Sequence, residues 1–410
     1  MAFITLSNER FEQFANTVEH RYFEQSVNMK ELLSKRGYQT ELVGYEDDNQ
    51  TLQVAALLYS APMTGGVHIE IHYGPLYKNT TYLKAFLIDL KKYAKAKKAI
   101  ELLVKPYDIY QFYNDHGQPI SPENNELLAL FESCGYTYTG LTQGFTDNDW
   151  HYVKNLENLT QEKLINSFSK KGKPLVKKAK TFGIKVRPLA RHELHLFKDI
   201  TSSTSDRRDY NDKPLEYYEY LFDSFADKAE FLVATLNFND YYKNLEKDQA
   251  KLATRLEKLE ADLETHPHSE KKRNQHREFS SQYQTFEVRK NEAKTFIEKY
   301  GDKDVILSGA VFIFTKQEAV YFFSGSYTEF NKFYAPAILQ EYIMLKAIKA
   351  NIKRYNLLSI EGIFDGSDGV LGFKQNFNGH IERKAGSFYY YPNPSKHKLI
   401  KLVKTLLRRN

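Results

Sequence analysis

The sequence predicts an α/β protein made of two tandem units, with a pair of long helices inserted into the second unit. Three observations support this prediction. Short apolar strands alternate with amphipathic helices in residues 1–150, as in a mixed sheet covered by helices. The same order of elements returns after residue 151. A charged segment at 240–300 carries a seven-residue apolar repeat instead, which is typical of paired helices.

The first unit contains one especially clear helix. Residues 82–97 (YLKAFLIDLKKYAKAK) place apolar side chains on one face, so this segment is expected to cover a sheet. The expected helices of this unit are 29–36, 82–97 and 125–134, and its expected strands are 40–45, 52–59 and 100–104. In the second unit we expect helices at 163–180, from 192 onward and at 336–351, and strands at 184–188, 231–235, 305–314, 319–324 and 358–362.

The inserted segment has two heptad series separated by Pro267. The apolar positions are Leu245, Leu252 and Leu259 before the proline, and Phe279, Phe286, Ala293 and Tyr300 after it. Two helices of roughly 25 residues are expected to form an antiparallel coiled-coil hairpin rather than one bent helix. The predicted division is a first α/β unit at 1–150, a second at 151–239 and 301–395, a coiled-coil arm at 240–300 and a basic C-terminal helix at 396–410.

Composition and charge exclude several classes of protein. The 410 residues include one cysteine, Cys134, which rules out an internal disulfide and a multi-cysteine metal site and fits a reducing cytoplasm. The N-terminus lacks the features of a signal peptide, and no apolar stretch of about 18 residues predicts a membrane span. P-loop, GxGxxG, HExxH and G-x-S-x-G motifs are absent. The net charge of +6 is modest, so its distribution matters more than its sum.

Two stretches place cations where they could meet a negative group. In DGSDGVLGFKQNFNGH (365–380), Lys374 follows Phe373, and it is either a surface lysine or a charge held beside apolar rings and aimed at an anion. In SDRRDYNDKPLEYYEYL (205–221), Arg207, Arg208 and Lys213 precede an expected helix start near Pro214. Cations at a helix N-terminus can bind an anion together with backbone N–H groups. Alternatively, the arginines pair with the neighbouring aspartates, which are Asp206, Asp209 and Asp212.

Three further stretches carry less specific signals. A basic block at 167–187 is either a solvated helix face or a surface that contacts phosphates. The lysines of this block that we assign to RNA contact are Lys170, Lys171, Lys173, Lys177 and Lys178. At 322–349, a strand and a glycine-containing turn lead to Tyr334, where a helix opens, as at the ligand end of acyl-transfer folds. The tail SKHKLIKLVKTLLRRN is a basic amphipathic helix that either binds a membrane surface or docks on the protein body.

The ordered set of these motifs resembles the FemABX family of non-ribosomal peptidyl transferases, which use aminoacyl-tRNA to build the interpeptide bridge of peptidoglycan. The resemblance covers essentially the whole chain and is strongest toward the streptococcal MurM/MurN branch. Its motifs are FEQS at 23–26, KPLEYY at 213–218, SGS at 324–326 with YAP at 334–336, and FK at 373–374. The resemblance implies two tandem GNAT-like (acetyltransferase-like) domains, with the helical arm inserted in the second.

The same resemblance implies roles for individual residues. Lys213, and Lys35 with a small gap in spacing, stand where the family grips the diphosphate of the acceptor substrate. Tyr217 and Tyr334 match aromatic positions that line the acceptor channel. Lys374 matches a lysine that stabilises the transition state. One departure concerns a place where a family member has an aspartate before a proline, because this chain has Lys105 there and no carboxylate base.

The implied reaction is attack of an amine on the ester of an aminoacyl-tRNA, expected to be alanyl-tRNA. An ester is an activated donor, so neither a metal nor another cofactor is expected. The implied acceptor is lipid II or its monoaminoacylated form, so the enzyme is expected in the cytoplasm, peripheral to the inner face of the membrane. Two alternatives remain open, which are a non-catalytic RNA-binding module and an acetyl-coenzyme A-dependent acyltransferase. The latter lacks support because no Q/R-x-x-G-x-G/A signature opens a helix.

Overall fold

A computed structural model describes residues 2–208 and 211–406. These residues form two eight-stranded sheets, each with helices packed against it. The first sheet runs β1-β2-β3-β4-β6-β16-β8, with β5 paired to β3, and the second runs β10-β11-β12-β13-β14-β9-β15-β7. Both sheets mix parallel and antiparallel pairs. The predicted α/β class with two tandem units is confirmed.

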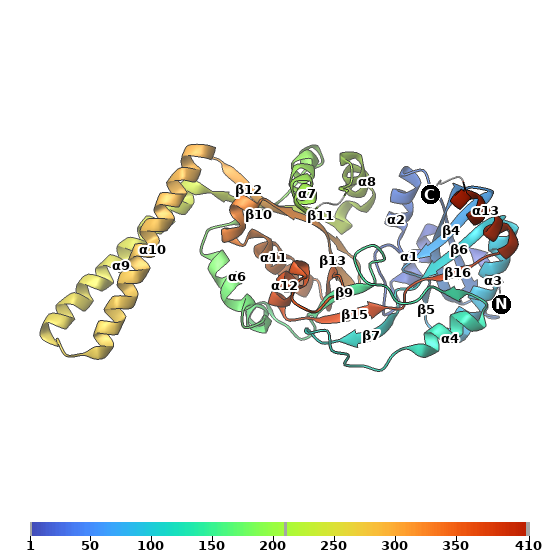
Figure 1. The fold of residues 1–410 in the computed structure, drawn as a ribbon, viewed down its shortest axis with the longest axis horizontal. Coiled ribbons are helices and arrows are strands. Elements are labelled where there is room, and N and C mark those ends of the chain that lie inside the picture. Colours follow the sequence, from blue (N-terminus) through green and yellow to red (C-terminus); the bar gives the residue numbers. More distant parts are fainter. Residues whose placement is uncertain (1, 209–210, 407–410) are drawn as a thin grey trace.

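The first sheet lies at the end of the molecule that holds both chain termini (Figure 1). Its strands are β1 (Ala2–Thr5), β2 (Gln39–Glu46), β3 (Leu52–Met63), β4 (Gly66–His72), β5 (Leu76–Tyr77), β6 (Ala99–Lys105), β8 (Thr137–Tyr138) and β16 (Phe388–Tyr390). The helices around it are α1 (Asn8–Ala15), α2 (Val27–Lys35), α3 (Thr80–Ala96), α4 (Asn125–Ser133) and α13 (Pro394–Leu406). The three helices expected in this unit are present as α2, α3 and α4.

The second sheet occupies the middle of the molecule (Figure 1). Its strands are β7 (Ile109–Tyr113), β9 (Trp150–Asn155), β10 (Lys185–Pro188), β11 (Ala229–Asn237), β12 (Asp304–Phe314), β13 (Glu318–Ser326), β14 (Arg354–Ser359) and β15 (His380–Lys384). Its helices are α5 (Gln161–Leu164), α6 (Gly172–Lys180), α7 (Leu194–Arg208), α8 (Leu215–Phe225), α11 (Ala335–Lys349) and α12 (Gly369–Lys374). Helices α7 and α8 cover one face, and α6, α11 and α12 cover the other (Figure 1).

The two sheets exchange strands. β7 belongs to the N-terminal part of the sequence but pairs with β15 in the second sheet. β16 lies near the C-terminus but pairs with β6 and β8 in the first sheet. The chain therefore ties the two units together twice, through β7 and through β16.

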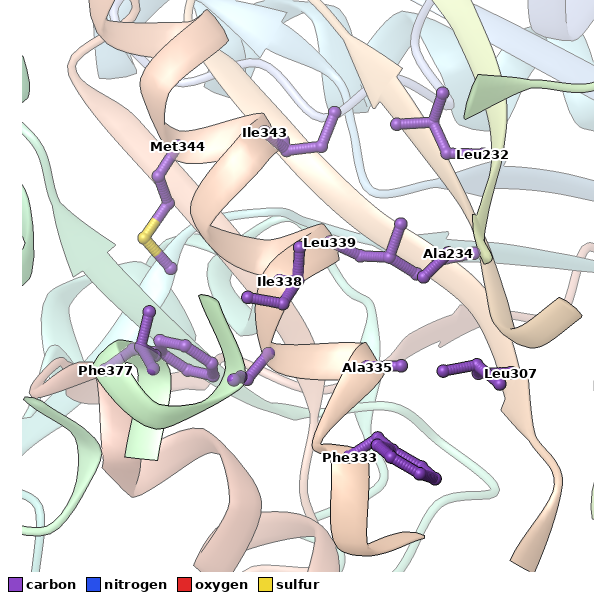
Figure 2. Packing of buried hydrophobic residues seen from close by; sticks show 14 of the residues in the cluster. Leu232, Ala234, Leu307, Phe333, Ala335, Ile338, Leu339, Ile343, Met344 and Phe377 are labelled. Carbon is purple, nitrogen blue, oxygen red and sulfur yellow. The ribbon is translucent and has the colours of Figure 1, made fainter. Parts of the chain in front are cut away.

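Helix α11 forms the centre of the larger core. Ala335, Leu339 and Ile343 are almost completely buried and face strands β11 and β12, as Figure 2 shows. On another side of the same helix, Met344 approaches Phe377, which follows α12 (Figure 2). Burial of most of the helix surface explains why its sequence is apolar nearly all round. The packing fixes α12 and α6 relative to the sheet.

The inserted segment forms two long helices, α9 (Phe238–Thr265) and α10 (Glu270–Tyr300), which pack on each other and project from the body (Figure 1). Leu245, Leu252 and Leu259 are buried along α9. Gln249 interrupts this apolar row, but its amide donates to Glu287 at 2.5 Å and accepts from Lys290 at 2.9 Å. The polar seam position is thus satisfied by partners on α10.

Two local expectations were wrong, and one short helix was not expected. The strand expected at 358–362 is β14, which ends at Ser359, and residues after it form a loop. The helix expected at 163–180 is broken into α5 and α6, since Gly172 lies so close to the carbonyl oxygen of Asn376 that a Cβ would stand 1.8 Å from it. The glycine-punctuated stretch before Lys374 contains the short helix α12, which was not anticipated.

Candidate functional site

The second sheet splits between β13 and β14. Their parallel pairing extends only from Glu318↔Arg354 to Val320↔Asn356. Beyond this point β13 continues to Ser326 and β14 to Ser359 without pairing to each other. A split between parallel strands places the ends of both strands next to the helices that cover the sheet, and here the neighbouring helix is α12.

Lys374 ends α12 and is almost completely buried, with 4% of its surface exposed. The helix begins at Asp368, whose carboxylate accepts from the backbone N–H groups of Val370 and Leu371. The Lys374 ammonium donates to the carbonyl oxygen of Ser359, at the end of β14, over 2.6 Å. Burial lowers the pKa of this lysine to about 7. The alternative of a surface lysine is therefore wrong.

The arginines at the end of α7 approach the same place. Arg208 lies close enough to lower the pKa of Lys374 further, after the larger effect of burial, and it also acts on the buried Tyr321 of β13. Arg207 donates to the carbonyl oxygen of Ser326 at 3.2 Å and to the hydroxyl of Thr328 at 2.6 Å. These arginines thus flank the free end of β13.

One of the aspartates that the sequence offered as a partner for these arginines pairs with a lysine instead. Asp212 pairs with Lys198 at 2.6 Å and accepts from the Tyr218 hydroxyl at 2.7 Å. Asp209 lies outside the described residues. In the part of the chain that the structure describes, no ion pair joins Asp206 or Asp212 to Arg207.

A pocket of about 160 Å³ lies between α2 and α8, on the side of β13 opposite to Lys374. We call it the α2–α8 pocket. Its lining residues are Glu24, Gln25, Met29, Leu33, Arg36, Leu57, Tyr59, His72 and Tyr217. Tyr217 is its most informative member, because the Arg36 guanidinium lies 5.4 Å and the Lys213 ammonium 5.6 Å from the centre of its ring. Two cations from different units of the fold therefore meet on one aromatic ring.

Sequence reasoning missed Arg36 and named its neighbour. Lys35 pairs with Glu31, one helical turn back, at 2.7 Å and does not line the α2–α8 pocket. Arg36 follows the last residue of α2 and stacks between Tyr38 and Tyr217. One signal was available in the sequence. The family resemblance matched Lys35 only with a gap in the spacing, so a residue next to Lys35 could equally have been the matching one.

A β-bulge connects the α2–α8 pocket with Lys374. Phe312 pairs with Tyr321 and Val311 with Phe323, so Phe322 has no partner across the strand. This extra residue turns Phe323 to the face of Tyr217, at 5.8 Å between ring centres, whereas Tyr321 remains on the face of α11. Bulges commonly re-aim side chains next to active sites. The pocket and Lys374 thus lie on opposite sides of the same strand.

The lysines of the basic block lie on α6 and in the turn before it. Val176 and Ala179 of α6 are buried, whereas Lys177 and Lys178 are exposed. The ammonium of Lys178 stands 5.7 Å from the ring centre of Tyr334. Among the described residues, none of Lys170, Lys171, Lys173, Lys177 and Lys178 forms an ion pair, although the adjacent Lys180 pairs with Glu341 at 2.7 Å.

Tyr334 lies with the basic block rather than in the α2–α8 pocket. It adopts a left-handed backbone conformation (φ 54°) at the start of α11, and it packs against the core that surrounds that helix. Phe373 also packs there, 5.4 Å from Phe377. The predicted residues therefore form two groups, one around Lys374 and α6 and one around Tyr217.

A larger cavity, of about 330 Å³, is lined by Phe23 and Ser26 of the FEQS motif but by none of the predicted substrate-binding or catalytic residues. It lies beside Phe23 and Phe225, near the turn between β12 and β13. Its buried Arg21 is already neutralised, since both oxygens of Glu12 accept from it at 2.8 Å. Its chemistry therefore gives no reason to prefer it over the groups around Lys374 and Tyr217.

The described residues contain no group of three or more histidine, cysteine or acidic side chains arranged to hold a metal ion. None of the helices in the described ranges has both the length and the apolar character needed to cross a membrane.

Comparison with known proteins identifies the class and then the family. The solved structure of FemX superposes with a TM-score of 0.78 over 98% of this chain and all of that chain, at 19% sequence identity, so the fold is shared. A Bacteroides thetaiotaomicron protein of unknown function superposes with a TM-score of 0.50 over 94% of this chain and 98% of that one, at 10% identity. The model of the FemAB family matches residues 6–405, so the chain belongs to the FemAB family.

Curated relatives agree with this assignment. Aminoacyltransferase FemA from Staphylococcus aureus (strain bovine RF122 / ET3-1) is 29% identical over 398 residues, which cover 95% of this chain and 94% of the relative. FemA from strain N315 matches with the same identity and coverage. The predicted FemABX membership and the predicted enzyme class, a transferase, are confirmed. The alternative of a non-catalytic RNA-binding module is thereby disfavoured.

Proposed function

We propose that this protein transfers an aminoacyl group, alanine, from aminoacyl-tRNA to the amine of the branch peptide of a lipid-linked peptidoglycan precursor. The product would carry alanine as its second bridge residue, as in the MurN type of the MurM/MurN branch. The observation that carries the proposal is the buried ammonium of Lys374 at the split between β13 and β14, with Arg36 and Lys213 at the ring of Tyr217 on the other side of β13. The aminoacyl donor is supported by the name of the FemA relatives.

In the proposed reaction the acceptor amine attacks the ester carbon of the donor. A C–N bond forms, the ester C–O bond breaks, and the ribose hydroxyl of the tRNA leaves. The amine loses one proton and the leaving oxygen gains one. The tetrahedral intermediate carries an oxyanion, which a cation in surroundings of low polarity stabilises strongly. Lys374 has this position, because its ammonium is buried at the end of β14 and lacks a carboxylate within ion-pair distance in the described residues.

A carboxylate base is not available at the place where the family resemblance led us to look for one. Lys105 is buried there and pairs with Asp149 at 2.8 Å. Proton transfer in the proposed reaction therefore passes directly from the amine toward the ribose oxygen. The neutral amine required for attack is generated before the two substrates meet.

Binding of the acceptor is assigned to the α2–α8 pocket. Arg36 and Lys213 converge there on Tyr217, and two cations on one ring provide a site for a diphosphate. The role of Lys35 stays a prediction. The aromatic ring of Tyr217 limits the pocket on the side of β13 and would direct the rest of the acceptor toward the split in the sheet.

The tRNA is assigned to the exposed lysines of α6. They lie on one helix face, unpaired within the described ranges, and Lys178 approaches Tyr334 at the start of α11. Phosphate contacts of this kind give strong, salt-dependent binding that is independent of sequence. The projecting α9–α10 hairpin supplies further surface for an extended partner (Figure 1).

Helix α13 reconciles the two interpretations of the tail. Its inner side docks on the first sheet, where Ile400 lies against Gly65 and Lys396 donates to the carbonyl oxygen of Gly65 at 2.7 Å. Its outer side exposes Leu399 and Leu402, at 60% and 57%, among lysines. A docked basic helix with an exposed apolar stripe suits peripheral binding to an anionic membrane at the cytoplasmic side.

The test is a transfer assay with purified protein. Alanyl-, seryl- and glycyl-tRNA are offered as donors, with lipid II and its monoaminoacylated form as acceptors. We expect transfer of alanine to the monoaminoacylated form without added metal or nucleotide triphosphate. Acetyl-coenzyme A serves as the competing donor. Acetylation of the acceptor with no transfer from any of the three tRNAs would contradict the proposal.

A further inference from the structure

A row of alternating imidazoles and carboxylates runs along the first sheet from α13 to the α2–α8 pocket. In spatial order its members are His397, Glu101, His68, Glu70, His72 and Glu24. The two histidines in the middle come from alternate positions of β4, so their side chains share one face of the strand. The transfer reaction proposed above gives no role to any of these residues, although Glu24 and His72 line the α2–α8 pocket.

The middle of the row is tightly bonded. His68 bridges Glu101 at 2.9 Å and Glu70 at 3.2 Å, and Glu70 also lies 2.7 Å from His72. Although burial opposes it, hydrogen bonds with the two carboxylates raise the pKa of His68 to about 9. An imidazole that bridges two carboxylates must be protonated on both nitrogens to satisfy them, so the row alternates positive and negative charge.

Glu24 ends the row and differs from the other carboxylates. It lines the α2–α8 pocket, and its side chain is 22% exposed. Among the described residues its one ion pair is with His72, at 3.6 Å, which is too long for a hydrogen bond, and the charges of Lys105 and Arg36 also act on it. Glu70, in contrast, accepts hydrogen bonds from two histidines. Both oxygens of Glu24 therefore retain unused capacity to accept hydrogen bonds at the wall of the pocket.

We propose that Glu24 is a ligand-binding subsite that accepts hydrogen bonds from an N–H or O–H group carried beside the anionic part of the acceptor. The inference rests on the proposed function, because Arg36 and Lys213 are taken to hold that anionic part. A ligand that satisfies both subsites is a glycosyl diphosphate, whose sugar hydroxyl or acetamido groups lie next to the phosphates. His72 is the positioning residue, held in orientation by Glu70.

A carboxylate beside a diphosphate site also discriminates against the wrong ligands. It repels an anion that offers no hydrogen-bond donor, such as inorganic pyrophosphate. The repulsion is offset only when the ligand carries a donor that forms a hydrogen bond to the carboxylate. The α2–α8 pocket would therefore distinguish a glycosyl diphosphate from inorganic phosphate and pyrophosphate. Arg36 and Lys213 alone would bind all of them.

The test compares two probes by calorimetry on the full chain. One probe is inorganic pyrophosphate and the other is a soluble uridine-diphosphate-linked N-acetylmuramoyl peptide. A hydrogen bond to a charged group is typically decisive for affinity, so Glu24→Ala is expected to weaken binding of the glycosyl probe by about ten- to a hundredfold. The same substitution leaves pyrophosphate binding unchanged or tightens it. Glu24→Gln, which keeps the shape, is expected to fall between wild type and Glu24→Ala.

Glu19→Ala, an exposed glutamate five residues earlier, is the matched control and binds both probes as wild type does. Equal weakening of both probes in the Glu24 variants would overturn the subsite, since it would indicate a structural role. An unchanged affinity for the glycosyl probe would overturn it as well. Arg36→Ala should weaken both probes. If the wild-type protein binds neither, the acceptor site of the proposed function fails and the subsite with it, whereas binding without aminoacyl transfer refutes only the proposed reaction.

Discussion

Replacing Lys374 by methionine is expected to lower the rate of transfer while making the protein more stable. Methionine fills a similar volume but cannot oppose the developing oxyanion. Loss of one preorganised donor of this kind costs about 10²–10³ in kcat, or about 3–4 kcal/mol. Because the ammonium would act only in the transition state, kcat and kcat/KM should fall together.

The gain in stability follows from the lowered pKa. The Lys374 ammonium has a pKa of about 7 in the folded chain and about 10.4 when unfolded. Below pH 7 both states are protonated and the folded state bears the whole cost of the buried charge, an upper bound of about 5 kcal/mol. Between pH 7 and about 10.4 the unfolded state binds more protons, so this cost declines with rising pH.

Methionine removes that cost but leaves the carbonyl oxygen of Ser359 without its donor, which costs about 1–3 kcal/mol. The variant should therefore be up to about 2–4 kcal/mol more stable than wild type at pH 6, with an advantage that disappears toward pH 10. Urea unfolding at several pH values measures the stability, and alanine transfer measures the rate.

Lys154→Met is the matched control. Lys154 is also buried, burial lowers its pKa to about 8, and it donates to a backbone carbonyl, that of Asn378, at 3.3 Å. It should gain stability in the same direction but keep its transfer rate. A Lys374→Met protein with near-normal transfer would refute the catalytic role, and one that is less stable at pH 6 would refute the pKa argument.

Three further substitutions test the other assignments. Arg36→Ala should raise the acceptor KM by more than tenfold, because a charge-assisted contact at the pocket is lost, whereas Lys35→Ala should change the KM less than threefold. The reverse order would favour Lys35, the residue that the sequence indicated. Lys177→Glu should weaken binding of tRNA and reduce its salt dependence, measured by filter binding between 50 and 200 mM salt, and an unchanged slope would remove α6 from the interface. Leu402→Asp should reduce co-sedimentation with anionic liposomes while leaving transfer to a soluble acceptor intact, and equal sedimentation would argue against membrane contact by α13.

The sequence predicted those parts of the fold that depend on local pattern. The stripe of 82–97 and the heptads of 240–300 follow from side-chain periodicity, and both appear as helices. The strand exchange could not be predicted, because β7 and β16 have the same local pattern whichever sheet they join. The break before Gly172 likewise depends on a tertiary contact, with Asn376, that no local pattern records.

The sequence predicted the part of the candidate site in which a charged residue stands among apolar neighbours. A lysine between aromatic residues suggested a charge in apolar surroundings, and Lys374 is buried. Arg36 was missed since adjacent residues at a helix end point in different directions, and only the tertiary structure decides which one faces Tyr217. The bulge at Phe322 was equally hidden, although it places the α2–α8 pocket and Lys374 on opposite sides of β13.

The strand exchange leads to a final prediction, that a residue near the C-terminus supports the stability of both sheets. Phe388 of β16 is completely buried in the first sheet and stacks on Phe131 with ring centres 4.1 Å apart. Phe388→Ala should lower the free energy of unfolding by about 3–5 kcal/mol, whereas Tyr389→Ala, on the outward face of the same strand, should lower it clearly less.

The single tryptophan, Trp150, lies in β9 of the second sheet, so its fluorescence reports on that sheet while circular dichroism reports on the whole chain. Because the exchanged strands tie the sheets together, the urea midpoints of both signals should fall in Phe388→Ala. A fluorescence transition that stays at the wild-type midpoint would mean that the two units unfold independently.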